Sequence, residues 1–357
     1  MNEKIIKVGI CQGNTNGIAY ELIIKAFGDA RMYELCIPII YGSSKVLAYH
    51  RKNLESQSLN VSNINKTEEA GVNRLNVFNI TNEEIIVEFG KLTNESVKIS
   101  DKALKKALEE LKAKAIDVLI TTPGTTDPIP LLEPATKNEN KNLKILVNDS
   151  LRIALATNNI PFSKIISSLT VESLTEKIKI LQSTLIRDFM ITSPRIAVLS
   201  LNPHADIKGN HGKEEDEIII PAIKAAAEES IFCIGPYSAD DFFHSEAYLK
   251  FDAVLAMYYD QGMIAFQTLT QGEGVIFTAN LPYIITAPNQ NISLEKAGKN
   301  LTSPLSLRNA LYLAIDIHRN RATDKEINKD PLKKLYLERG SDNEKLDLTK
   351  DEAQIEN

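Results

Sequence analysis

The chain has 357 residues, of which 43% are hydrophobic and 25% are charged, and its formal net charge is −6 at pH 7. That length allows two domains with substantial cores, and the composition is ordinary for a globular protein. The negative charge argues against a mainly electrostatic nucleic-acid binder, which needs clustered Lys and Arg. Since no apolar run approaches the roughly 20 residues that cross a bilayer and no signal-peptide pattern precedes the first strand, we expect a cytoplasmic protein without membrane contact.

The cysteines indicate neither a disulfide framework nor a structural zinc site. Cys11, Cys36 and Cys233 form an odd, scattered set without C-x-x-C spacing. Structural zinc sites and disulfide scaffolds both need paired cysteines. Buried, unreactive thiols are therefore the preferred interpretation.

Strand-like and helix-like segments alternate along the chain, which is typical of a mainly parallel sheet covered by helices. Ser100 could cap a helix over residues 102–115, whose apolar residues form one stripe. Residues 122–142 carry four prolines and a polar run, and this composition predicts a loop. The first half has predicted strands at 4–11, 36–41, 75–80 and 118–121 and a further helix at 19–27.

Alternation resumes at residue 143 and continues to about residue 319. The segments 274–278 and 283–286 could form an antiparallel or edge pair of strands, and a helix over 303–319 opens on Ser303-Pro304. Residues 321–357 are rich in mixed charge and poor in apolar residues, which predicts a mostly disordered tail with at most one short helix. Other predicted elements are strands at 143–147, 195–201, 231–234 and 253–257 and a helix at 214–229.

The loop at residues 9–17 follows a strand and opens a helix, so its backbone amides could cradle an anion. It does not read G-x-G-x-x-G, and no dinucleotide fingerprint can be assigned. A purely structural strand-to-helix turn explains this loop as well as a ligand site does.

Polar residues directly after strands are the other candidates, because ligands of α/β proteins bind beyond the carboxyl ends of strands. His204 follows a strand in Asn-Pro-His-Ala, and Asp260 follows another in Tyr-Asp-Gln-Gly. Asp240 could face a cleft or help to cap the next helix. Three further histidines show no partner in the sequence and are interpreted as surface residues: His50, His244 and His318.

Several segments carry a family resemblance: Leu201-Asn202-Pro203-His204-Ala205, Gly212-Lys213-Glu214-Glu215, Gly235-Pro236, Ala239-Asp240, Ala253 to Gly262, Gly274-Val275, Leu281-Pro282, Ala297-Gly298 and the loop Gly13 to Ile18. Together they resemble the PdxA family of NAD-dependent 4-hydroxythreonine-4-phosphate dehydrogenases of vitamin B6 biosynthesis. The resemblance runs from about residue 5 to about residue 320.

The resemblance implies a two-domain α/β fold like that of isocitrate and isopropylmalate dehydrogenases, with mainly parallel sheets and a cleft between the domains. Residues 1–150 with about 300–320 would form the first domain, and residues 151–299 the second. It also implies a homodimer, NAD and a divalent metal as cofactors, and a small phosphorylated ligand. In the family, histidines of both subunits bind the metal, and a hydride passes from the substrate to NAD.

Carried over one position at a time, the metal histidines of the family fall on Asn159, His204 and Tyr259. Its substrate-binding Lys, Asn and Arg fall on Gln267, Ile276 and Ile285. The family's His-Thr pair has no counterpart near residues 122–132. Among the matched positions, only His204 keeps the family residue.

Two interpretations remain open. The chain could be a working dehydrogenase of this family, which the resemblance along most of the chain favours. Alternatively, it could be a catalytically inactive paralogue that keeps the fold and the dimer as a small-molecule-binding or protein-interaction module, which the replaced side chains favour. A new metal site made of His204, Asp206 and His211 is a further possibility.

Overall fold

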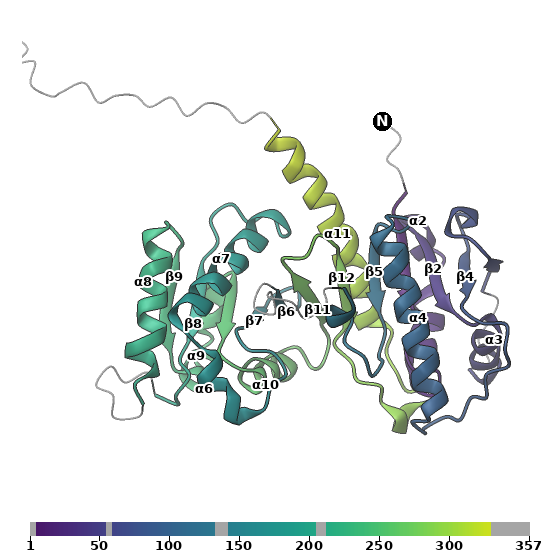
Figure 1. The fold of residues 1–357 in the computed structure, drawn as a ribbon, viewed down its shortest axis with the longest axis horizontal. Coiled ribbons are helices and arrows are strands. Elements are labelled where there is room, and N and C mark those ends of the chain that lie inside the picture. Colours follow the sequence, from purple (N-terminus) through teal and green to yellow (C-terminus); the bar gives the residue numbers. More distant parts are fainter. Residues whose placement is uncertain (1–4, 55–58, 133–141, 205–211, 330–357) are drawn as a thin grey trace, which may run out of the picture.

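A computed structural model describes residues 5–54, 59–132, 142–204 and 212–329. These residues form a sheet of 12 strands with helices on both faces (Figure 1). The strand order is β3-β4-β2-β1-β5-β12-β11-β6-β7-β10-β8-β9. The strands are β1 Lys7–Cys11, β2 Ile37–Gly42, β3 Val61–Ile64, β4 Leu75–Asn79, β5 Val118–Thr121, β6 Leu143–Val147, β7 Arg152–Leu155, β8 Ile196–Leu199, β9 Cys233–Tyr237, β10 Ala253–Ala256, β11 Val275–Ala279 and β12 Ile285–Pro288.

Eleven α-helical segments connect or flank these strands in the described residues. None of the described helices is long and apolar enough to cross a membrane. They are α1 Ala19–Phe27, α2 Met32–Leu35, α3 Ser44–Asn53, α4 Asn94–Lys112, α5 Ile129–Leu132, α6 Ile165–Ser168, α7 Val171–Arg187, α8 Ile220–Glu228, α9 Ala239–His244, α10 Tyr259–Leu269 and α11 Leu305–Ile327.

The strand direction reverses at the centre of the sheet. β3, β4, β2, β1, β5 and β12 are mutually parallel, as are β7, β10, β8 and β9. Between these sets, β11 is antiparallel to β12 and to β6, and β6 is antiparallel to β7. The carboxyl ends of the two parallel sets therefore lie at opposite edges of the sheet.

The core is divided by the two faces of the sheet. One face packs against α1, α7, α8 and α11 in one large apolar cluster. On the other face, α4 and α5 cover a cluster on the first half, while α9 and α10 cover a separate cluster on the second half. Mixed α/β architecture with a largely parallel sheet confirms the predicted fold class.

Several predicted elements agree with the structure. Helix α1 has the predicted bounds, β11 and β12 form the predicted antiparallel pair, and the three cysteines are free and buried. The pair lies at the centre of the sheet, not at its edge. The predicted domain boundary near residue 150 falls in the turn between β6 and β7, where the Asn148 amide donates to the Leu151 carbonyl at 2.9 Å, and the division itself stays a prediction.

Three predictions about helices were wrong. Helix α4 begins at Asn94, capped by Thr93 in a capping box with Ser96, and Ser100 lies buried inside it. The segment predicted as a loop at residues 122–142 contains α5. Helix α11 continues to Ile327, beyond the end predicted at residue 319. Residues 330–357 of the predicted tail lie outside the described residues.

Asp188 anchors the C-terminal part of α11. Its carboxylate is buried, and Arg321 of α11 donates from Nε and Nη2 to its two oxygens at 2.8 and 2.9 Å. Arg187 donates to the same oxygens at 2.7 and 3.1 Å. Burial alone would raise the pKa of Asp188, but the hydrogen bonds from Arg321 and Arg187 lower it below its ordinary value.

We expect Arg321→Met to lower the free energy of unfolding by about 2 kcal/mol, because Asp188 would stay buried with fewer charge-assisted hydrogen bonds. The folded-state pKa of Asp188 is lowered, so this contribution is present above the unfolded value of about 3.9 and is lost as pH falls through the folded value. The difference should therefore shrink in acid. Urea unfolding across pH measures it, with Lys325→Met, an exposed residue of the same helix, as the control. Equal stabilities of the two variants at neutral pH would contradict the assignment.

Candidate functional site

Three of the positions singled out in the sequence follow adjacent strands. β7, β10 and β8 are neighbours in the sheet and run parallel, so their carboxyl ends lie at one edge. Asn159 follows β7, Tyr259 begins α10 after β10, and His204 follows β8. All three side chains are exposed. The structure thus brings the ends of these strands together, as expected of a ligand site in an α/β protein.

Hydrogen bonds join the three strand ends. Thr157 Oγ1 donates to the Met257 carbonyl at 2.8 Å, which ties the end of β7 to the end of β10. The side chain of Gln261 accepts from the Met257 amide and donates to the Ser200 carbonyl, both at 2.7 Å. This second link joins β10 to β8. Gln261 was not among the residues predicted to form the site, although its position two residues after Tyr259 could have indicated it.

The segment after β8 is fixed by an acidic pair. Glu215 is buried, and its Oε1 accepts from the backbone amides of Leu201 and Asn202 at 2.9 Å each. Asn202 Nδ2 donates to Glu214 at 2.9 Å and to Glu215 at 2.8 Å. The hydrogen bond from Asn202 lowers the pKa of Glu214. Glu214 and Glu215 therefore stabilise this loop through their hydrogen bonds.

The donor set at the strand ends does not fit a divalent transition metal. Asn159 offers only an amide oxygen, and burial, followed by the charge of Asp260, raises the pKa of Tyr259, which keeps it a neutral phenol. His204 alone supplies an imidazole. A catalytic metal of this kind needs about three protein ligands. Within residues 5–54, 59–132, 142–204 and 212–329, no group of three or more His, Cys, Asp or Glu could hold a metal ion. Asp206 and His211 lie outside those ranges.

The positions matched to the family's substrate contacts are mostly apolar. Gln267 lies two turns after Tyr259 on α10 and is exposed. Ile276 of β11 pairs with Ala287 and packs against the cluster covered by α9 and α10. Ile285 of β12 is 3% exposed, pairs with Leu119 and belongs to the cluster covered by α4. Neither isoleucine can bind an anion.

Asp240 and Asp260 have helical positions that the sequence analysis did not predict. Asp240 lies in the first turn of α9, whose N-cap is Ser238, and Asp260 lies in the first turn of α10, not in a loop. Both side chains are exposed. A carboxylate in the first turn interacts favourably with the helix dipole, which is a sufficient structural role for each.

The loop after β1 is a packed structural turn. Gln12, Asn14, Thr15 and Asn16 are fully buried, and Gly13 has φ +65° with Thr122 and Pro123 so close that a Cβ would clash. The Asn14 side chain bonds Ser96 of α4, and the Asn16 amide bonds Thr93. The alternative of an open anion site at this loop is therefore not supported by these residues.

His50 was wrongly interpreted as a surface residue. It is 1% exposed, and its Nε2 lies 2.8 Å from the carbonyl oxygen of Thr15 in the same buried loop. The ring packs against Tyr20 and Phe89, with centroids 5.1 and 4.9 Å away. Burial lowers the pKa of His50 to about 4, against a smaller opposing effect of the Thr15 carbonyl.

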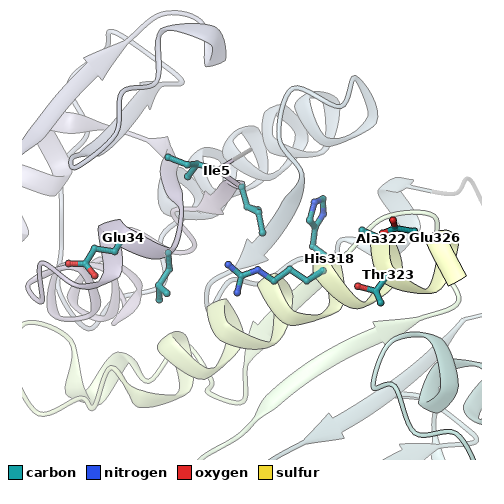
Figure 2. Close-up of a pocket in the computed structure, with 9 residues that line it drawn as sticks. Ile5, Glu34, His318, Ala322, Thr323 and Glu326 are labelled. Carbon is teal, nitrogen blue, oxygen red and sulfur yellow. The ribbon is translucent and has the colours of Figure 1, made fainter. Parts of the chain in front are cut away.

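Two cavities lie beside α11, away from these strand ends. One of about 360 Å³ separates α11 from the start of β1 and from α2. Figure 2 shows Ile5 and Glu34 on one side of it and His318, Thr323 and Glu326 of α11 on the other. The second cavity, of about 510 Å³, lies between α11 and the turn that joins β6 to β7.

Comparison with known sequences decides the family. The sequence profile described as "Pyridoxal phosphate biosynthetic protein PdxA" matches residues 34–314. The chain belongs to the PdxA family. It is 46% identical to a 4-hydroxythreonine-4-phosphate dehydrogenase of Bacteroides thetaiotaomicron, with 98% of each chain covered. It is 33% identical to the protein of that name from a Sulfurihydrogenibium species, over 89% of this chain and 100% of the other.

Solved structures support the PdxA fold. A 4-hydroxythreonine-4-phosphate dehydrogenase from Klebsiella pneumoniae superimposes with a TM-score of 0.71 at 23% identity, covering 88% of this chain and 98% of the other. At that identity the likeness concerns the fold alone. This PdxA-family chain therefore has the architecture of its relatives, while its own side chains decide what the site can do.

We expect the buried His50 to make this PdxA-family chain acid-sensitive. Its folded-state pKa is lowered to about 4, so the unfolded chain binds more protons below about pH 6.5, and stability is lost as pH falls from there towards 4. The loss attributable to His50 should approach roughly 3 kcal/mol. His50→Gln, which keeps a donor for Thr15, should remove that part of the slope in urea unfolding. His244→Gln, at an exposed site, is the control, and an unchanged slope in His50→Gln would refute the assignment.

Proposed function

We propose that this PdxA-family chain does not oxidise 4-hydroxythreonine 4-phosphate and instead acts as a homodimeric binding module on the family's fold. The observation that carries the proposal is the set of side chains at the ends of β7, β10 and β8, where one imidazole is accompanied by an amide and a neutral phenol. Three free, buried cysteines fit a reducing compartment such as the cytoplasm.

The metal positions support the proposal first. In the family as the resemblance describes it, a metal held by histidines polarises the hydroxyl that is oxidised. A single histidine with Asn159 and Tyr259 lacks the donors for such an ion, since amides and protonated phenols are weak ligands for it. We therefore assign no reaction step to a metal or to NAD in this chain.

The substrate positions support it independently. A phosphorylated hydroxy-amino acid needs cations opposite its phosphate and carboxylate. Gln267 and Ile285 stand where the resemblance puts a Lys and an Arg, and Ile285 is buried among apolar residues. Each lost charge-assisted contact typically weakens binding by about 1.5–3 kcal/mol. Two such losses together would weaken binding by several orders of magnitude.

Exposed apolar side chains near the same strand ends support association with a second copy. Phe162 is 78% exposed, Ile166 of α6 57% and Ile264 of α10 65%. The Phe162 ring lies 6.2 Å from that of Tyr258, which precedes α10, so the segment after β7 contacts the start of α10. Clustered exposed apolar residues indicate an interaction surface. The resemblance implies a homodimer whose subunits meet at the site, and this patch fits that partner.

The second candidate function is the dehydrogenase activity itself. It is favoured by the name of the Bacteroides thetaiotaomicron relative, which is 46% identical across 98% of both chains. It would require a metal site of different composition, such as one that adds Asp206 and His211 to His204. The following experiment separates the two candidates.

We expect the purified protein to retain no stoichiometric Zn²⁺ after dialysis and to form no NADH with 4-hydroxythreonine 4-phosphate. The variant Asn159→His/Tyr259→His would place two further imidazoles beside the end of β8. It should bind Zn²⁺ at least about a hundredfold more tightly, because direct ligands contribute more than outer contacts worth about 10- to 100-fold. Elemental analysis and competition with a chromogenic chelator measure both quantities.

The control adds His204→Ala to that variant and should reverse the gain. NADH formation by the unmodified protein, abolished by His204→Ala, would overturn the proposal and establish the dehydrogenase.

We expect Ile264→Glu to weaken the homodimer by at least about tenfold in dissociation constant, since a carboxylate would be buried at the interface. Sedimentation velocity over a concentration series measures this. Ile86→Glu is the matched control, because Ile86 is equally exposed, at 67%, but lies on the first half of the chain. A dimer that dissociates equally in both variants, or a monomeric unmodified protein, would rule out this surface.

A further inference from the structure

The cavity of about 510 Å³ beside α11 lies on the face of the sheet opposite the family's matched positions. Val147 and Val275 line it and belong to the cluster shared with α11. Their strand neighbours Leu146 and Ile276 point to the other face, into the cluster covered by α9 and α10. A cavity of this size falls within the range of small-molecule sites. It is therefore separate from the site considered above.

Arg152 lines this cavity without a carboxylate partner. Its guanidinium lies 4.8 Å from the centroid of the Phe189 ring, and Nη1 donates to the Asp252 carbonyl at 3.3 Å. Its Nε is buried and has no hydrogen-bond partner, and in the described part of the chain Arg152 forms no ion pair. Burial lowers the pKa of Arg152, and the negative charges of Asp252 and Asp149 oppose this only in part.

Asp316 of α11 lines the same cavity and carries the opposite charge. Among the described residues, its carboxylate has no hydrogen bond or ion pair. Burial raises its pKa, and the charge of Arg319 opposes this only in part. By contrast, Asp188, which also borders the cavity, is already paired with Arg321 and Arg187. Asp149 is exposed at the rim and adds a further negative charge.

A partly buried guanidinium and an exposed carboxylate thus line one cavity without pairing with each other. A ligand that carries both charges would compensate both groups at once, whereas a singly charged ligand would leave one of them unpaired. Met190 and Leu313 add apolar wall, which suits a short carbon chain between the two charges.

We propose that this cavity binds a small dipolar metabolite with a primary ammonium group at one end and a carboxylate or phosphate at the other. The anionic group bonds Arg152, and the ammonium group bonds Asp316. The inference does not rest on the proposed function, because it concerns other residues on the other face of the sheet.

Isothermal titration calorimetry with four probes tests the proposal. γ-Aminobutyrate and O-phosphoethanolamine carry both charges, and butyrate and ethylamine carry one each. At least one dipolar probe should bind with a dissociation constant about tenfold or more below those of both singly charged probes. Tighter binding of γ-aminobutyrate would identify a carboxylate ligand, and tighter binding of O-phosphoethanolamine a phosphate ligand.

Variants then locate the binding. Arg152→Met and the nearly isosteric Asp316→Asn should each weaken the preferred dipolar probe about tenfold or more. Arg195→Met and Asp324→Asn, which do not line the cavity, should leave it unchanged. If Arg152→Met fails to fold, Asp316→Asn still tests the proposal. Absence of binding by both dipolar probes, equal binding of a singly charged probe, or unchanged affinity in Asp316→Asn would each overturn the proposal.

Discussion

The run of three antiparallel pairings, β12 with β11, β11 with β6 and β6 with β7, is the constraint on which the rest of the structure depends. It joins the two parallel sets of strands into one sheet and makes the strand direction of one set opposite to that of the other. Because of that reversal, the buried turn after β1 and the exposed ends of β7, β10 and β8 lie at opposite edges. It also divides one face into two apolar clusters, with Ile276 packed against one and Ile285 within the other. The positions matched to the substrate contacts therefore lie where the two halves of the chain meet.

The strand ends that would form the family's site hold together without a metal. Gln261 and Thr157 bridge β7, β10 and β8 through backbone atoms, and Glu215 fixes the segment after β8 through two amides. None of these contacts uses Asn159, Tyr259 or His204. The side chains at the exposed positions Asn159 and Tyr259 can therefore change at little cost to folding, because surface substitutions away from such contacts are nearly neutral.

Local patterns in the sequence predicted the parts of the fold that depend on local interactions. Helix α1 and the strands around it were predictable because buried apolar runs and helical periodicity are properties of neighbouring residues. The burial of His50 was not, since it is decided by the Thr15 carbonyl, 35 residues away in sequence. The start of α10 was missed because Tyr-Asp-Gln-Gly has the composition of a loop, while the Gln261 side chain binds backbone groups of both β10 and β8.

The candidate site, too, could be predicted from the sequence only in part. The resemblance located Asn159, His204 and Tyr259 by position, and the topology then explained why three distant segments meet at one edge. Whether Ile285 is open to a ligand could not be read from the sequence, because its burial depends on β5 and on the helix that covers it.

The burial of Ile285 also bears on which of the matched positions can change without affecting the stability of the fold. A cation at that position would enter an apolar cluster, and an unpaired buried charge is strongly unfavourable. Changes at the exposed Asn159 and Tyr259 carry no such penalty. Asn159 and Tyr259 can therefore change one residue at a time, whereas Ile276 and Ile285 are coupled to the stability of the fold.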